Sequence, residues 1–332
     1  LLSRGLGDVY KRQVLRLSLR KNIPSVRTKN MSNDDWLKIR TKSIGGSDCG
    51  AILGMNKYES PLSLYNKKLG IIEQEDISEK LPVVFGNWNE DLVAKLFEKE
   101  TGKKVRNHNY MMYHPEYDFI SANVDKVLIS ENAILECKTA SEFKRKEWID
   151  GNVPGSYMAQ CYHYMLVTGA ERVYIAVLFG NSGFQWEVVE RDEEIIQNIL
   201  EKEIEFWEEH IQKGVPPKAD GSEASEQALN NMWKDTKAES VSFGETQGDL
   251  LKQWNAIRKQ RKQLDDDERE IKNKLREYMG ENEQGENENF KVTWKPQKRN
   301  TFDKKQFEKD NPELAKKYIK QSESRVFKIS EM

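Results

Sequence analysis

Two β-rich runs that lie close together in the chain constrain its fold most. The runs Phe119–Ile129 and Ala133–Thr139 are joined by the turn-like Ser130-Glu131-Asn132, and this pattern predicts a β-hairpin. The first run contains Asp125, and the second contains Glu136-Cys137-Lys138. Because side chains alternate between the two faces of a strand, Glu136 and Lys138 project from one face and Cys137 from the other. The hairpin therefore gathers acidic and basic groups on one face.

These residue types suit metal-dependent hydrolysis. Two carboxylates from adjacent strands, Asp125 and Glu136, can hold a hard divalent cation such as Mg²⁺, with Mn²⁺ as an alternative. The ammonium of Lys138 beside them can orient a water that attacks phosphorus, or help to deprotonate it. A cross-strand salt bridge between Lys138 and a carboxylate explains the same residues without any chemistry. The local pattern leaves both interpretations open.

The segments around the hairpin predict the rest of the architecture. Apolar residues at helical spacing predict a helix over Gly86–Gly102, with Glu90 in its opening turns, where it could complete the metal coordination. The segments after the hairpin predict a helix at about Gly155–Val167, strands over Val173–Phe179 and Phe184–Val189, and a long helix from Asp192 to Pro216-Pro217. We therefore expect an α+β (mixed α/β) fold with a central mixed sheet flanked by helices.

A second group of residues precedes the hairpin. Arg40 and Ser47 are seven residues apart, across the junction between a predicted helix and the glycine-rich turn Ile44-Gly45-Gly46-Ser47-Asp48. A guanidinium, a hydroxyl and bare glycine amides are what a terminal phosphate requires. The structural alternative is an Arg that binds the last carbonyls of its own helix and a Ser that begins a turn.

Gln160 and Tyr164 stand four residues apart and so share one helix face. The pair resembles one found in RecB-like nucleases, and this resemblance implies a position on the active-site side of the core, near DNA. The alternative is a Tyr packed in the core beside a Gln that faces solvent.

Taken together, these features resemble the YqaJ-type viral recombinase family, which is similar to lambda exonuclease within the PD-(D/E)xK nuclease superfamily. The residues that carry the resemblance keep one order over about residues 31–217: Arg40, Ile44 to Asp48, the G-x-x-x-E of Gly86 to Glu90, Asp125, Glu136-Cys137-Lys138, and Gln160 with Tyr164. Val124 stands where the superfamily name has Pro, and Asn89-Glu90-Asp91 replaces Leu-Glu-Pro. Neither departure removes a ligand.

The resemblance implies a restriction-endonuclease-like core that degrades linear duplex DNA from 5′ to 3′ with Mg²⁺. It implies metal binding by Asp125 and Glu136 with help from the Cys137 carbonyl, activation of water by Lys138, and an acid at Glu90. It also implies a 5′-phosphate pocket at Arg40 and Ser47, and DNA contacts at Gln160 and Tyr164. The implied partners are double-stranded DNA ends and a single-strand annealing protein, and a homo-oligomer is compatible with the pattern. A nicking or structure-specific endonuclease and a non-catalytic DNA-binding module are the alternatives.

Composition limits the class of protein. The 332 residues carry 53 Lys+Arg against 55 Asp+Glu, so no global basic field indicates a nucleic-acid partner. No apolar run approaches the roughly 20 residues of a membrane span. Cys49, Cys137 and Cys161 lie far apart without a CxxC motif or a nearby His pair, and the spacing of His163 suggests no zinc site. The scattered cysteines favour a reducing cytosol, and the family resemblance implies the cytoplasm of a bacterial host and a phage or prophage origin.

The two ends of the chain differ from its middle. Residues 1–30 are expected to be a non-native or disordered leader, since Leu1 to Gln13 resembles translated adapter sequence, and Met31 is the expected native start. The predicted nuclease domain covers 31–217, and the polar stretch 218–247 is the predicted linker. Over 248–332 we expect a helical arm with a heptad seam interrupted by Arg261 and Glu268, followed by a small β element and a basic tail.

Overall fold

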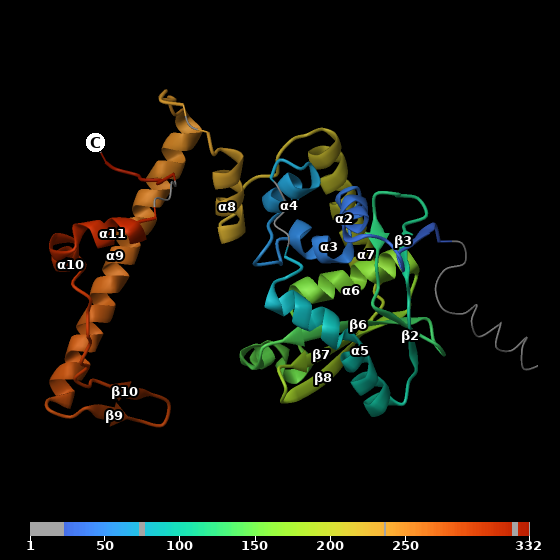
Figure 1. The fold of residues 1–332 in the computed structure, drawn as a ribbon, viewed down its shortest axis with the longest axis horizontal. Coiled ribbons are helices and arrows are strands. Elements are labelled where there is room, and N and C mark those ends of the chain that lie inside the picture. The colour runs from blue at the N-terminus through green and yellow to red at the C-terminus, as the bar shows by residue number, and fades with distance from the viewer. Residues whose placement is uncertain (1–22, 73–76, 236, 321–324, 332) are drawn as a thin grey trace, which may run out of the picture. The chain divides into compact units, whose positions relative to one another are not determined.

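The computed structural model describes residues 23–72, 77–235, 237–320 and 325–331, and the leader prediction for residues 1–22 lies outside them. The chain divides into two compact units, one ending at Lys234 and the other beginning at Asp235 (Figure 1). The first unit holds the residues that the sequence marked as functional.

Among the described residues, the larger sheet of the first unit has five strands in the order β2-β5-β6-β7-β8. Only the central pair β6 and β7 is parallel, and it aligns Glu136 with Ile175; the other neighbours are antiparallel. The strands are β2 (Val105–Asn107), β5 (Lys126–Leu128), β6 (Ala133–Ala140), β7 (Arg172–Phe179) and β8 (Gly183–Glu190). The predicted hairpin is confirmed as the β5–β6 pair, and the predicted mixed sheet is confirmed as well.

Helices cover both faces of this sheet (Figure 1). On one face α5 (Leu81–Thr101) packs Val93, Ala94 and Phe97 against strand residues such as Leu135. On the other face lie α6 (Gly155–Thr168), α3 (Gly46–Ile52) and α7 (Glu193–Glu205). Alternate residues of β6 therefore serve two different cores, which fixes its register strongly.

The helix that carries Glu90 is longer than the sequence predicted. It begins at Leu81, because Pro82 in its first turn suits the fixed backbone angle and missing amide of proline. Glu90 consequently lies near the middle of α5, and the prediction that placed it in the opening turns is wrong.

A second, three-stranded sheet has the order β1-β3-β4, formed by β1 (Ser25–Arg27), β3 (Tyr110–Tyr113) and β4 (Ser121–Ala122). The first predicted hairpin strand is thus broken, since β4 belongs to this sheet and β5 to the larger one. The leader prediction fails for its last residues, because β1 pairs with β3 and Ile23 packs against the core. Residues 23–27 are part of the fold.

The predicted linker 218–247 also contains regular structure. Helix α8 (Glu223–Met232), capped by Ser222, buries Ala224, Ser225 and Ala228. Ala228 joins a core cluster with Leu62 and Leu64 of α4 (Pro61–Lys68). The polar composition concealed this helix because its buried face is made of small residues.

The described residues of the first unit also form α2 (Asn33–Thr41), the 3₁₀ segment η1 (Glu142–Gly151), and the π-helical η2 (Phe206–Gln212), which continues α7. The Ser32 side chain caps α2 by accepting the amide of Asp35, and Asp192 caps α7 in the same way. The start of α7 at Asp192 is where the sequence predicted it.

The second unit is built around α9 (Glu245–Met279). A hairpin of β9 (Gln284–Glu286) and β10 (Lys291–Thr293) follows, and then α10 (Lys304–Asp310) and α11 (Pro312–Tyr318). The apolar seam of α9 is exposed at Leu250, Ile257 and Leu264. Over the described part of the chain, none of the helices combines the length and apolar character needed to cross a bilayer.

Candidate active site

The centre of the candidate site is a group of hydrogen-bonded side chains on β6 and α6. Glu136 is only 3% exposed, and its Oε1 accepts hydrogen bonds from Lys138 Nζ at 2.6 Å and Gln160 Nε2 at 2.9 Å. Lys138 also donates to Gln160 Oε1 at 2.9 Å. Cys137 instead packs in the cluster on the opposite face of the sheet. The predicted common face of Glu136 and Lys138 is confirmed.

Asp125 lies in the break between β4 and β5, where the chain passes from one sheet to the other. Its Oδ2 accepts a hydrogen bond from the Cys137 amide at 2.8 Å. This hydrogen bond ties the residue just before β5 to strand β6. Burial and the nearby negative charge of Glu136 raise the pKa of Asp125 to about 7. The two carboxylates therefore share one region that favours a cation.

Lys138 is held in the charged form. Burial opposes its charge, but the carboxylates of Glu136 and Asp125 raise the pKa of Lys138 above its usual range. The ammonium also lies 4.8 Å from the centre of the Tyr157 ring, a cation–π distance. A lysine in this state can donate hydrogen bonds and neutralise charge, and it is a poor proton acceptor.

Glu90 lies at the edge of this group. Lys126 Nζ binds Glu90 Oε1 at 2.5 Å and Asp91 Oδ1 at 2.8 Å. Burial, followed by the charge of Asp125, raises the pKa of Glu90. Its role as the helix-borne acid stays a prediction, as does the role of the Cys137 carbonyl. Sequence reasoning missed Lys126, whose position directly after Asp125 was its only signal.

Arg40 and Ser47, the second predicted group, are brought together. Arg40 Nη2 donates to Ser47 Oγ at 2.6 Å, and the guanidinium lies 4.6 Å from the centre of the Trp36 ring. Stacking on an aromatic ring leaves the edge of a guanidinium available for hydrogen bonds. The alternative was an Arg40 side chain bound to the last carbonyls of its own helix. The structure instead shows Arg40 Nη2 donating to Ser47.

A buried ion pair fixes the loop between these two residues. Lys68 Nζ donates to the carbonyls of Arg40 at 2.7 Å and Ser43 at 2.5 Å, and to Asp48 Oδ2 at 2.5 Å. Burial alone would raise the pKa of Asp48, but the charges of Lys68 and Arg40 hold it well below its usual range. The same Oδ2 accepts a hydrogen bond from the Gly45 amide at 3.0 Å. The prediction that this amide is bare is therefore wrong.

Sequence reasoning assigned no role to Asp48 or Lys68. At the end of α4, Lys68 has the sequence signature of a residue that complements the helix dipole. Its actual acceptors lie 20 to 28 positions away. The local sequence gave no signal for that pairing.

Helix α3 packs tightly on α6 at the edge of the site. A Cβ added to Gly46 would lie 2.5 Å from Tyr164 Cε1 and 3.1 Å from Gln160 Cγ. Gln160 Nε2 donates to Tyr164 Oη at 2.7 Å, and both side chains are buried. The alternative of a solvent-facing Gln160 is therefore wrong, and the glycine of the turn is required by this close approach.

One pocket joins the two groups of residues. Its wall combines the Arg40 loop with the carboxylates of the sheet, and it is lined by Trp36, Arg40, Ser43, Gly45, Gly46, Ser47, Met111, Ser121, Asn123, Asp125, Glu136, Gln160 and Tyr164. A phosphate bound at Arg40 and a cation bound at the carboxylates would thus occupy the same pocket.

The residues of the pocket fit a divalent cation. Glu136 Oε2 is buried and lacks a hydrogen-bond partner, a costly state for a carboxylate oxygen that a metal would relieve. Together with Asp125 it provides the hard oxygen donors that Mg²⁺ prefers.

Comparison with known proteins identifies the family. Residues 35–171 match the model of the YqaJ-like viral recombinase domain. Over 305 residues the chain is 39% identical to the uncharacterized protein YqaJ of Bacillus subtilis strain 168, covering 91% of this chain and 95% of that protein. The chain belongs to the YqaJ-like viral recombinase family. The resemblance inferred from the sequence motifs is confirmed.

Solved structures that are similar to this YqaJ-like chain include two exonucleases. The alkaline exonuclease LHK-Exo from Laribacter hongkongensis is 18% identical, with a TM-score of 0.47 over 55% of this chain and 94% of that one. A phage-related exonuclease from Haemophilus somnus 129PT is 14% identical, with a TM-score of 0.37 over 52% and 96% of the two chains.

Proposed function

We propose that this YqaJ-like protein is a metal-dependent deoxyribonuclease that degrades linear double-stranded DNA from the 5′ end. The observation that carries this proposal is the single pocket that holds both the Arg40–Ser47 pair and the Asp125–Glu136 carboxylates. Membership in a viral recombinase family supports DNA as the substrate and annealing of the remaining single strand as the next step.

Each group of the pocket has a part in the proposed reaction. The Arg40 guanidinium and the Ser47 hydroxyl bind the terminal 5′-phosphate through charge-assisted hydrogen bonds. Gln160 fixes the orientation of Glu136, and Tyr164 supports Gln160 from the next helical turn. Gln160 and Tyr164 also line the wall along which the DNA strand would lie.

Asp125 and Glu136 would hold Mg²⁺, or Mn²⁺ in its place, with the Cys137 carbonyl as a further donor. When bound, such a cation supplies charge stabilisation at the phosphate and a more acidic water. The Lys138 ammonium donates a hydrogen bond that orients the attacking water and balances the charge that develops on phosphorus. Glu90, held by Lys126, adds negative charge beside Asp125.

The reaction exchanges one P–O bond for another. The attacking water gives up a proton to solvent as its oxygen bonds to phosphorus and the bond to the 3′-oxygen breaks. The 3′-oxygen takes up a proton from solvent and leaves as a hydroxyl. The shortened strand therefore ends in a new 5′-phosphate, the group that Arg40 and Ser47 recognise. Each turnover regenerates the preferred substrate end.

Digestion of labelled duplex in Mg²⁺ tests the proposal. A linear duplex should be degraded, and a covalently closed circle of the same sequence should stay intact because it has no end. Excess EDTA should stop the reaction. Cleavage of the circle would instead indicate an endonuclease on the same core.

Two variants test the assigned residues. Glu136→Gln and Lys138→Ala should slow cleavage about 100- to 1,000-fold, the usual cost of removing one group that stabilises charge in the transition state. DNA binding should change little, measured by fluorescence anisotropy. Glu190→Gln is the matched control, since that carboxylate is 62% exposed on β8. Normal turnover by Glu136→Gln would exclude this centre.

A further inference from the structure

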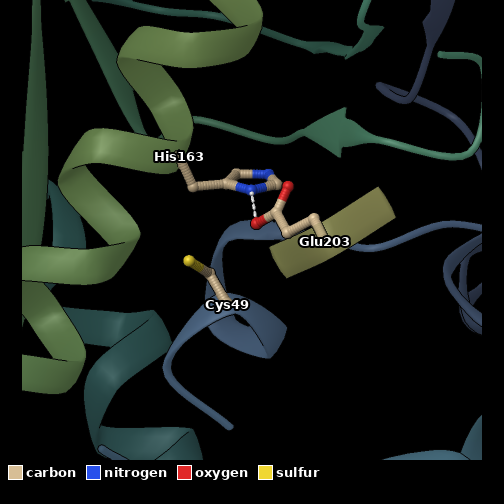
Figure 2. A group of neighbouring side chains, drawn as sticks. All are labelled: Cys49, His163 and Glu203. Carbon is tan, nitrogen blue, oxygen red and sulfur yellow. Dashed lines mark hydrogen bonds and ion pairs between the residues drawn. The ribbon is translucent and has the colours of Figure 1, made fainter. Parts of the chain in front are cut away.

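Three side chains with different metal-binding donors meet in the core, outside the pocket. Cys49 of α3, His163 of α6 and Glu203 of α7 lie close together, and the His163 ring faces the Glu203 carboxylate with the Cys49 sulfur to one side of them (Figure 2). All three are 0% exposed. One donor atom from each lies within 4.8 Å of the other two. This spacing is close enough for one ion to contact all three.

The histidine is oriented as metal-bound histidines usually are. Its Nε2 lies 2.8 Å from the Ser121 carbonyl oxygen, which can only accept a hydrogen bond, so Nε2 carries the proton. Nδ1 then faces Glu203 Oε1 at 2.7 Å. A backbone carbonyl that holds one ring nitrogen leaves the other free to coordinate a metal.

The glutamate offers more than one oxygen. Glu203 Oε2 is buried and has no hydrogen-bond partner, although a fully buried carboxylate oxygen normally has one. Both oxygens of Glu203, Nδ1 of His163 and the sulfur of Cys49 make four donor atoms. Four donors that mix sulfur, nitrogen and oxygen suit the coordination number and the borderline softness of zinc.

We propose that Cys49, His163 and Glu203 form a structural Zn²⁺ site, with Glu203 binding through both oxygens. The charges balance, since one Zn²⁺ neutralises a thiolate and a carboxylate beside a neutral imidazole. A closed, fully buried set of protein ligands without an open position is typical of structural zinc. The site joins three helices, and through Ser121 it also contacts the pocket wall.

The same residues without metal would form a protonated His163 paired with an ionised Glu203, next to a neutral thiol. Burial, followed by the charge of Glu203 and a hydrogen bond from the thiol to that carboxylate, raises the pKa of the Cys49 thiol well above its ordinary value. Zinc binding then releases two protons, one from the imidazolium and one from the thiol. The metal-free arrangement leaves Glu203 Oε2 unsatisfied, and the zinc site does not.

The first measurement is zinc content. The full chain carrying Asp125→Asn and Glu136→Gln, which removes the carboxylates of the pocket, is incubated with Zn²⁺, dialysed and analysed by plasma mass spectrometry. We expect one zinc per chain. In the same background Cys49→Ala should lose it, and Cys161→Ala should keep it, because Cys161 is also fully buried but lies outside the cluster.

The second measurement uses Co²⁺ in the same background without any cysteine change, and so does not depend on how Cys49→Ala folds. A thiolate-to-cobalt charge-transfer band with intense tetrahedral d–d bands is expected, and added Zn²⁺ should abolish both. Folded protein that retains no zinc and shows no cobalt–thiolate band would overturn the proposal. Equal zinc in Cys49→Ala and Cys161→Ala would overturn it too. Either result would leave a buried His–Glu ion pair.

Discussion

At the scale of single residues, Arg40 gives the sharpest prediction. Arg40→Ala should lower kcat/KM on 5′-phosphorylated duplex about 10- to 100-fold, because a hydrogen bond to a charged group contributes about 1.5–3 kcal/mol. On 5′-hydroxyl duplex the change should be small, since that end offers no charge to the guanidinium. Ser47→Ala should show the same preference more weakly.

The measurement is kcat/KM on 5′-phosphorylated duplex compared with kcat/KM on 5′-hydroxyl duplex. Lys38→Ala is the control variant. Lys38 lies on the same helix, with its side chain 75% exposed. Equal slowing on both ends by Arg40→Ala would assign Arg40 to structure alone.

The raised pKa of Asp125 leads us to expect that metal binding depends on pH. Its pKa is raised to about 7 by burial and by Glu136, so below that pH a proton occupies the group that the cation needs. Affinity for Mn²⁺ should fall about tenfold per pH unit below 7 and level off above it, because one proton competes with the metal. Titrations of Mn²⁺ by calorimetry between pH 5.5 and 8.5 check this. A flat affinity over that range contradicts it.

Sequence patterns could identify those site residues that lie on regular elements. Strand alternation placed Glu136 and Lys138 on one face, and the four-residue spacing placed Gln160 beside Tyr164. The pairing of Lys68 with Asp48 could not be found, because it depends on how α4 packs against the Arg40 loop. The same holds for Cys49, His163 and Glu203, whose proximity exists only once three helices are packed together.

At the scale of elements, the contact of α3 with α6 depends on Gly46. Gly46→Ala should lower the free energy of unfolding by about 1–3 kcal/mol, the usual cost of overpacking a core, because the new methyl group would meet the Tyr164 ring. Urea denaturation measures the change.

Gly86→Ala is the matched control for this substitution. Gly86 also lies in a helix, and an added Cβ would make only an ordinary contact with Thr139 Oγ1 at 3.6 Å. It should leave stability unchanged or raise it by about 0.5–1 kcal/mol through helix propensity. Similar losses in the two variants would show that packing against Tyr164 is not the cause.

Elements with strong local patterns were predicted well, and those that depend on tertiary contacts were not. Helix α6 and strand β7 have long apolar runs, and β8 alternates apolar and polar residues after a clear turn signal. Helix α8 instead relies on small buried residues that fit against α4, and β1 on pairing with β3. Short polar segments of this kind gain their stability from neighbours that the local sequence does not reveal.

At the scale of the whole molecule, the boundary between the two units predicts where the chain can be shortened. A chain ending at Lys234 should fold and cut short phosphorylated duplexes at the normal rate, because every proposed site residue lies in the first unit. A chain ending at Gly221 should be about 1–3 kcal/mol less stable, since it loses α8 from the core cluster of α4. Urea denaturation and turnover distinguish the two truncations.

The second unit is expected to serve DNA retention or partner docking. From Lys291 to Lys328, twelve Lys and Arg oppose five Asp and Glu. If this tail contacts phosphates, the chain ending at Lys234 should bind DNA with a shallower dependence on salt than the full chain. An unchanged salt slope would point instead to a protein partner.

The break between β4 and β5 connects the Arg40–Ser47 group to Asp125 at a fixed distance. Ile44 lies in the loop between Arg40 and Ser47. Its amide donates to the Phe119 carbonyl at 2.6 Å, and its carbonyl accepts the amide of Ser121 in β4 at 2.8 Å. The chain then runs directly to Asp125, which the Cys137 amide holds against β6. If Arg40 and Ser47 hold the DNA end and Asp125 helps to hold the cation, as proposed, the distance between these two groups is set by hydrogen bonds of the main chain. Every cut should release a fragment of the same length, whatever its base sequence.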